Sequence, residues 1–358
     1  MHRTPYAALR RTSSGTARRA AGGLTALVLA AGLAGCGTSG DGSGEGEGDQ
    51  AVDLSDAFAE ASTATRYRVT SYSAQTLSSP LLGVDTRTEI DEDRPASESE
   101  VTPEASHTTV DISAVLGPMA GDALSISLEL WSTPDRLVLD TRDYAAVKEI
   151  NPAADLGPFE PGVSYVDLAA VQEDSPDLEA AIVGQGLPDL QEIAQEIPEI
   201  LDDVQQEGDI VTGSTTYTAL LTALGGDADN TARSVAGGIA QNLGVDVEAL
   251  TALYLDFYDS APTEVTLGLD DEGSVSDIRY TVDLSDVFER VYAEPELFDE
   301  PPTGDRLAEL RGLARDTEWT ATTLVDYEID EDLEVEAPPE TTDDRTEDWL
   351  RFLEQSGF

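Results

Sequence analysis

The side chains that carry out most enzyme chemistry are scarce in this chain. His107 is the one histidine after position 2, and Lys148 is the one lysine. His107 lies at the margin of a predicted strand, and no Gly-x-Ser-x-Gly elbow occurs that would supply a serine nucleophile. Lys148 has no Ser-x-x-Lys context. One histidine is also too few for a usual zinc site. Because all of these groups are scarce, we predict a non-enzymatic protein without a cofactor.

Carboxylates are the one reactive group in excess. The chain has 72 Asp and Glu against 20 Lys and Arg, a net charge of −52. Among so many acids some pair would fit a glycosidase by chance, so a carboxylate-based hydrolase needs a polar cleft to be credible. The acidic runs 89–93 and 227–230 do not match the Asp-x-Asp-x-Asp-Gly calcium loop. We interpret both runs as solvated turns and predict no metal site.

Cys36, the one cysteine of the chain, ends an export signal. Residues 1–19 hold five arginines and no acid, and an uncharged apolar run at 24–31 follows. Leu33-Ala34-Gly35-Cys36 resembles the lipobox of bacterial lipoproteins. That resemblance implies cleavage before Cys36, diacylation of its sulfur and a lipid anchor on the extracytoplasmic face of the cell membrane. An ordinary signal peptide with an incidental cysteine is the alternative.

The charge of the processed chain limits its partners. Removal of residues 1–35 leaves 15 basic and 72 acidic residues, a net charge of −57. Such a surface repels nucleic acid and anionic lipid headgroups, so neither is an expected partner. We interpret the acidity as an adaptation to solubility in high salt.

We predict four segments along the chain. Residues 1–35 form the signal peptide and 36–50 a flexible tether of Gly, Ser and acids. Residues 51–339 form one domain, and 340–358 an acidic tail. In that tail Trp349, Phe352 and Leu353 share one side of a short amphipathic helix. It either docks on the domain, covers an opening or contacts a partner, or it is a frayed terminus.

Alternating apolar residues predict strands with one buried face. The segments are 67–72, 124–131, 137–139, 319–329 and 333–337, the last ended by Pro338-Pro339. The clearest hairpin joins 265–269 to 278–284 through an acidic turn at 270–273.

Other segments have helical spacing. They are 54–61, 187–204, 233–243 and 247–257, with Asp246 as a cap of the last helix and Pro198 expected to kink or split the second. The order of strands, helices and strands predicts an α+β fold with a mostly antiparallel sheet.

The order of these features resembles the LppX/LprG group of actinobacterial lipoproteins, relatives of the LolA-like lipid carriers. The likeness rests on a first helix before Tyr67-Arg68-Val69-Thr70, on Leu128-Glu129-Leu130-Trp131 and on the 265–284 hairpin. It also places a strand over 215–221 after Gly213, although Tyr217, Leu220 and Leu224 suit a helix equally. The resemblance implies a curved half-barrel wrapped over helices, with an apolar cavity that binds a lipid or glycolipid.

Under that resemblance, a membrane-anchored lipoprotein binds and transfers an acyl chain, with an envelope transporter as a compatible partner. A sensor or scaffold that acts through protein contacts around a filled or vestigial cavity is the alternative. The cavity would lie between the 265–284 hairpin and the 187–204 helix. The predicted cavity-lining residues are Val69, Leu128, Leu130, Leu139, Leu190, Ile193, Ile197, Leu201, Leu250, Tyr254, Val265, Leu267, Ile278, Tyr280 and Val282.

Overall fold

The computed structural model describes residues 54–81, 83–111, 126–150, 152, 156–174, 190–224, 226, 228–298 and 300–356. The signal peptide, Cys36, the tether and the apolar positions Leu124 and Leu187 lie outside these residues, so their roles stay predictions. No helix in the described part of the chain is long and apolar enough to cross a membrane.

One open antiparallel sheet of 12 strands organises the molecule, which confirms the predicted α+β class. The strand order is β7-β6-β5-β4-β3-β1-β12-β11-β10-β9-β8, and β2 pairs with β1 beside this path. The strands are β1 (Tyr67–Ser79), β2 (Val84–Arg87), β3 (Ser97–Val101), β4 (Ser106–Asp111), β5 (Ser127–Ser132), β6 (Arg136–Asp140), β7 (Val163–Asp167), β8 (Asp202–Glu207), β9 (Ile210–Thr216), β10 (Pro262–Leu269), β11 (Val275–Asp283) and β12 (Glu318–Ile329).

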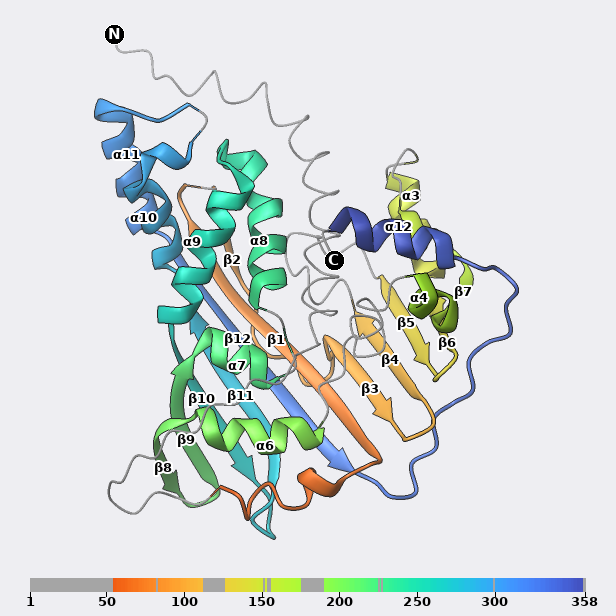
Figure 1. Cartoon of the computed structure of the whole chain (residues 1–358). Coiled ribbons are helices and arrows are strands. Elements are labelled where there is room, and N and C mark those ends of the chain that lie inside the picture. The colour runs from red at the N-terminus through yellow and green to blue at the C-terminus, as the bar shows by residue number, and fades with distance from the viewer. Residues whose placement is uncertain are drawn as a thin grey trace.

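The described helices lie in two groups on the same face of this sheet (Figure 1). One group packs near the β8–β11 end and the other near the β5–β7 end. The first group and its extensions are η3 (Ala61–Thr63), α6 (Leu190–Ile200), α7 (Tyr217–Ala223), α8 (Ala228–Leu243), α9 (Val247–Ser260), α10 (Asp286–Ala293), η7 (Pro295–Leu297) and α11 (Gly304–Arg315). The second is η5 (Arg142–Tyr144), α3 (Ala145–Ile150), η6 (Gly157–Phe159), α4 (Leu168–Asp174) and α12 (Thr346–Ser356).

Several elements form where local sequence signals agree. The β10–β11 hairpin closes through Asp270, whose Oδ1 accepts hydrogen bonds from the backbone N–H groups of Glu272 and Ser274 at 2.8 and 2.9 Å. Gly273 has a φ of 86°, a conformation that glycine adopts without strain. Asp246 caps α9 by accepting a hydrogen bond from the Ala249 N–H at 2.9 Å. The hairpin and the α9 cap are confirmed.

Three local predictions are wrong. The predicted 54–61 helix is a series of turns that ends in η3. The predicted 187–204 helix ends at Ile200, and Val204 belongs to β8. Pro198 lies inside α6, which continues to Ile200, so the helix is not split there, and the kink stays a prediction. No strand occurs over 333–337, since β12 is the last strand of the sheet.

The ambiguous segment after Gly213 is divided between the two predicted structures. β9 ends at Thr216, whose side-chain hydroxyl accepts a hydrogen bond from the Ala219 N–H at 3.2 Å and so caps α7. The helical spacing of Leu220 and Ala223 places both side chains in the core. A strand over 215–221 is therefore wrong beyond Thr216.

Candidate functional site

The strand registers divide the sheet into two faces of opposite chemistry. Successive residues of a strand point to opposite faces, so each pairing assigns a side to both residues. Val69, Val265 and Leu128 point to the face that carries the helices, which we call the inner face. Every aspartate, glutamate and arginine that the registers pair points to the other, outer face.

The predicted cavity-lining residues all point to the inner face or come from the helices over it, but they pack into three separate clusters. Thirteen of the fifteen are buried, and Leu130 and Tyr280 are half-buried. One cluster joins Val69, Leu190, Ile193, Ile197, Leu201, Val265, Leu267 and Ile278. The second contains Leu250, Tyr254 and Val282, with Tyr280 against both of these clusters, and the third contains Leu128 and Leu139, with Leu130 packed against them.

Direct packing fills the place where the sequence predicted the cavity. Ile193 and Ile197 of α6 share a cluster with Val265 and Ile278 of the β10–β11 hairpin, and these side chains are 0–1% exposed. Side chains exposed so little lie against other protein atoms rather than against an open space. The buried side chains therefore anchor the helices to the sheet, and any ligand surface lies elsewhere on the inner face.

Small hydroxyl residues occupy the middle of the inner face, between the clusters. Ser71 pairs with Ser97 across β1 and β3, and Ser99 pairs with Thr108 across β3 and β4. The row of Ser97 ends in Val110 on β4, and the row of Ser99 begins with Val69 on β1. Ser73 pairs with Thr323 of β12 on the same face. We call this set the hydroxyl band, and its members are Ser71, Ser73, Ser97, Ser99, Ser106, Thr108 and Thr323.

The hydroxyl band is partly open. Ser73 is exposed, and Ser71, Ser97, Ser106 and Thr323 are half-buried. Ser99 and Thr108 are buried, and the Ser99 hydroxyl donates to the Thr108 hydroxyl at 3.1 Å. A sheet face that packed against a helix along its whole length would carry larger apolar residues here. The band consists instead of small, uncharged side chains between the residues of the first and third clusters.

Half-buried apolar and aromatic residues border the hydroxyl band on both sides. Leu130 follows Thr108 in the register on one side. Tyr280 pairs with Thr323 and Tyr327 pairs with Val69 on the other. Both tyrosines are half-buried, and burial raises the pKa of both phenols. Apolar and aromatic side chains therefore lie next to the small hydroxyl residues on both sides of the band.

His107 lies on the outer face, away from this site. Its ring stacks on Trp131 with centroids 4.5 Å apart, and its Nε2 lies 3.4 Å from a carboxylate oxygen of Glu129. His107 lies on β4, and Trp131 and Glu129 lie on β5, so these contacts hold the histidine on the outer face.

The 89–93 run lies in turn and loop structure, as predicted, but residues 228–230 of the second run begin α8 (Ala228–Leu243), so the predicted turn is wrong there. In the 89–93 run Asp91 accepts a hydrogen bond from the Asp93 N–H at 3.1 Å, and Asp227 of the second run lies outside the described residues. In the described part of the chain no group of three or more His, Cys, Asp or Glu side chains is placed to hold a metal ion.

The C-terminal segment docks at the β7 end of the sheet, which the sequence left open. The backbone N–H of Tyr165 donates to Asp343 O, and the Arg345 N–H donates to Tyr165 O, both at 2.8 Å. Trp349 is fully buried in the third cluster, with its ring centroid 5.7 Å from that of Phe159. The tail is therefore part of the packed structure up to at least Phe352, and the amphipathic spacing of Trp349 and Phe352 was the signal for it.

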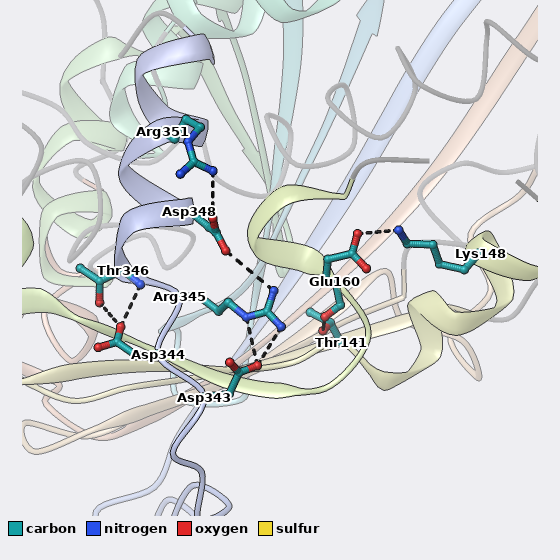
Figure 2. A network of polar contacts seen from close by, with 9 residues as sticks. All are labelled: Thr141, Lys148, Glu160, Asp343, Asp344, Arg345, Thr346, Asp348 and Arg351. Atoms are coloured by element: carbon teal, nitrogen blue, oxygen red, sulfur yellow. Dashed lines mark hydrogen bonds and ion pairs between the residues drawn. The ribbon is translucent and has the colours of Figure 1, made fainter. Parts of the chain in front are cut away.

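Figure 2 shows the polar contacts around this docked segment. Arg345 pairs with Asp343 at 2.8 Å, and the Asp344 carboxylate accepts hydrogen bonds from the N–H and hydroxyl of Thr346 at 3.0 and 2.6 Å. The hydrogen bonds from Thr346 lower the pKa of Asp344. Lys148 pairs with Glu160 beside them. Lys148, Arg345 and Arg351 each pair with a carboxylate. These ion pairs help to dock the C-terminal segment, and the residues drawn form no separate reactive group.

Comparison with known proteins adds no identity. No family model and no curated protein matches the chain. Among solved structures, one titled GphF Dehydratase 1 is similar at 10% sequence identity over 76% of this chain and 82% of that one. Its TM-score of 0.14 is too low to carry an argument about fold or activity.

Proposed function

We propose that this protein is a non-enzymatic lipoprotein, anchored to the cell membrane through Cys36, whose curved half-barrel sheet binds an acyl chain of a lipid or lipoglycan. The observation that supports the proposal is the inner face, where the paired residues of the described strands carry no charge in a chain of 72 acids, and where several members of the hydroxyl band are half-buried or exposed. The open antiparallel sheet with helices on one face agrees with the architecture that the LppX/LprG resemblance implies.

The chemistry of the inner face suits an acyl chain. Each buried methylene contributes roughly 0.8 kcal/mol, and no charged side chain on this face would lose its hydration when the chain enters. The serines of the hydroxyl band are small, so they leave room above the strands that larger apolar residues would fill. Because a lipid tail gains equally from the bilayer, net transfer would depend on a partner such as an envelope transporter.

Neighbouring residues of β1 provide a matched test. Ser73 is exposed on the inner face, whereas Ala74 points to the outer face. In the chain carrying Cys36→Ser, which cannot be acylated, we expect Ser73→Asp to weaken uptake of a pyrene-labelled fatty acyl ester at least tenfold, because it places a charge in the acyl path. Ala74→Asp should leave uptake unchanged. Mass spectrometry of the same chain should find co-purified lipid.

One observation favours a second function. Thirteen of the predicted lining residues pack against protein, so a sensor or scaffold with a filled core fits those positions equally well. A folded Cys36→Ser chain that carries no lipid and takes up no pyrene ester would overturn lipid binding and favour this alternative.

A further inference from the structure

The C-terminal segment 341–352, which we call the arm, makes its contacts at one end of the sheet (Figure 1). Its backbone forms two hydrogen bonds with Tyr165 of β7, and the Thr341 hydroxyl donates to Val163 O at 2.6 Å. The helix α12 packs against β7, η6 and α4, and Trp349 is fully buried there. The arm is thus a compact docking unit with a defined receiving site on β7 and its neighbours.

Residues 334–340 form a connector between the arm and the body of the domain. The chain is last held at Leu333, a buried residue whose carbonyl oxygen accepts a hydrogen bond from Arg66 Nη1 at 2.7 Å beside the start of β1. Most residues of the connector are exposed, and no hydrogen bond holds them within the part of the chain that the structure describes. The connector therefore restricts the arm chiefly through its length.

That length is close to the least that can join the two places. Five strand spacings separate β1 from β7, which is about 24 Å at about 4.8 Å each. The eight residue steps from Leu333 to Thr341 reach at most about 26–29 Å. A connector that must be almost fully extended gives the arm a low effective concentration at its own receiving site. A second copy can then compete for that site.

We infer that the arm exchanges between two copies of this chain, so that each arm docks on β7 of the other copy in a two-fold symmetric dimer. Each arm makes the same docking contacts in the dimer as in the single chain, so the exchange costs no contact of the arm. It replaces the stretched closure within one chain by association, which a high local concentration of copies favours. Anchoring at Cys36 would supply such a concentration on a membrane surface. The inference goes beyond lipid binding and does not depend on it.

A mixture of two single-cysteine chains tests the exchange directly. Both are full chains with Cys36→Ser, and one carries Tyr165→Cys and the other Asp344→Cys, at positions that lie opposite each other in a parallel bridge. After equilibration at about 1 mM, the scale of a short linker's effective concentration, oxidation should give a covalent heterodimer with one copy of each chain. A matched mixture of Thr70→Cys and Glu98→Cys chains, which alter paired positions of β1 and β3, should give no heterodimer because neither strand leaves the sheet.

The length of the connector provides a second test. Deletion of Val335 and Glu336 leaves six steps that reach at most about 22 Å, so sedimentation should find a dimer at concentrations where the parent chain is a monomer. A four-residue Gly-Ser insertion after Ala337 relaxes the connector and should lower the yield of heterodimer at least about threefold.

A chain with both Tyr165→Cys and Asp344→Cys reports whether the arm docks at all, and at low concentration it should close its disulfide within one chain. If it closes while the mixed single-cysteine chains give no more heterodimer than the Thr70 and Glu98 control, the inference is overturned and the arm belongs to one chain. A deletion chain that stays monomeric, or a double variant that fails to close, would overturn it as well. Lipid uptake by the parent chain is a separate measurement, so the proposed function stands or fails independently.

Discussion

The two faces of the sheet differ more than any two other regions of the molecule. On β1 the outer residue Arg68 forms ion pairs with Glu100 and Glu328 at 3.2 and 2.6 Å, while its inner neighbour Val69 is buried among apolar residues. The same strands thus carry a charged surface on one side and an apolar surface on the other. A period of two in the side chains allows both within one segment.

The difference shows how an extremely acidic protein keeps an apolar face. Acids on the outer face stay hydrated and are screened by salt, so they cost little. The same acids on the inner face would lose their hydration without a partner. The separation of charge by face is therefore a condition of folding, because the inner face of the described strands carries neutral side chains.

The most severe test of this comparison moves a charge from one face to the other. Val265 is fully buried on the inner face, and Thr266 follows it on the outer face opposite Arg279. Val265→Asp should destabilise the protein by about 4 kcal/mol or more, because the carboxylate would be buried without a partner. Thr266→Asp should change the free energy of unfolding by less than about 0.5 kcal/mol. Chemical denaturation measures both, and similar losses would refute the assignment of faces.

A second test removes part of the cover of the inner face. Trp349 is buried against Phe159 and closes the β7 end of the core. Trp349→Ala should cost about 3–5 kcal/mol, the usual loss for a buried aromatic residue. Arg351→Ala on the same helix removes one exposed ion pair with Asp348 and should cost at most about 1 kcal/mol. A small loss for Trp349→Ala in thermal and denaturant unfolding would mean that the C-terminal segment is dispensable.

The smallest expected effect concerns a like-charge pair on the outer face. Asp326 lies directly opposite Asp277, and burial followed by Asp277 and Glu92 raises the pKa of Asp326, while Arg279 opposes the shift. A carboxyl whose folded pKa is raised weakens the fold when ionised, and this penalty fades as the pH falls through the folded pKa. Asp326→Asn should therefore stabilise the protein at pH 7 by about 0.5 kcal/mol, the scale of a cross-strand like-charge pair.

That gain should disappear in acid, where Asp326 is protonated in both the folded and unfolded states. Denaturation at a series of pH values checks the sign. Asp85→Asn, which changes an exposed acid opposite Ser78, is the control and should show no such trend. A gain that grows toward low pH would contradict the assignment.

Local patterns predicted elements well where a strand or helix carries its own signal. The β10–β11 hairpin has alternation on both sides of an acidic glycine turn, and α9 has a capping aspartate before an apolar stripe. The errors fell on the ends of elements and on segments without a strand partner. Residues 333–337 alternate like a strand, but β12 already has β1 and β11 on its two sides, so no partner position remains beside it.

The candidate site was predictable only in its parts. Ser71-x-Ser73, Ser97-x-Ser99 and Ser106-x-Thr108 show the alternation of hydroxyls in the sequence itself. Nothing local shows that these pairs lie side by side, because their adjacency depends on the pairing of β1, β3 and β4. The predicted lining residues were apolar and inward, yet their packing into three clusters depended on where the helices cross the sheet.

The sequence by itself determined the charge, the scarcity of catalytic groups and the alternation that gives each strand two faces. These are properties of single residues and of their spacing, which no packing can change. Only the tertiary structure decided which side of each strand faces the helices and which hydroxyls become neighbours. It also left the Tyr327 hydroxyl without a hydrogen-bond partner among the described residues. Those outcomes depend on contacts between residues as far apart as β1 and β12, where each choice is made by the burial of many side chains at once.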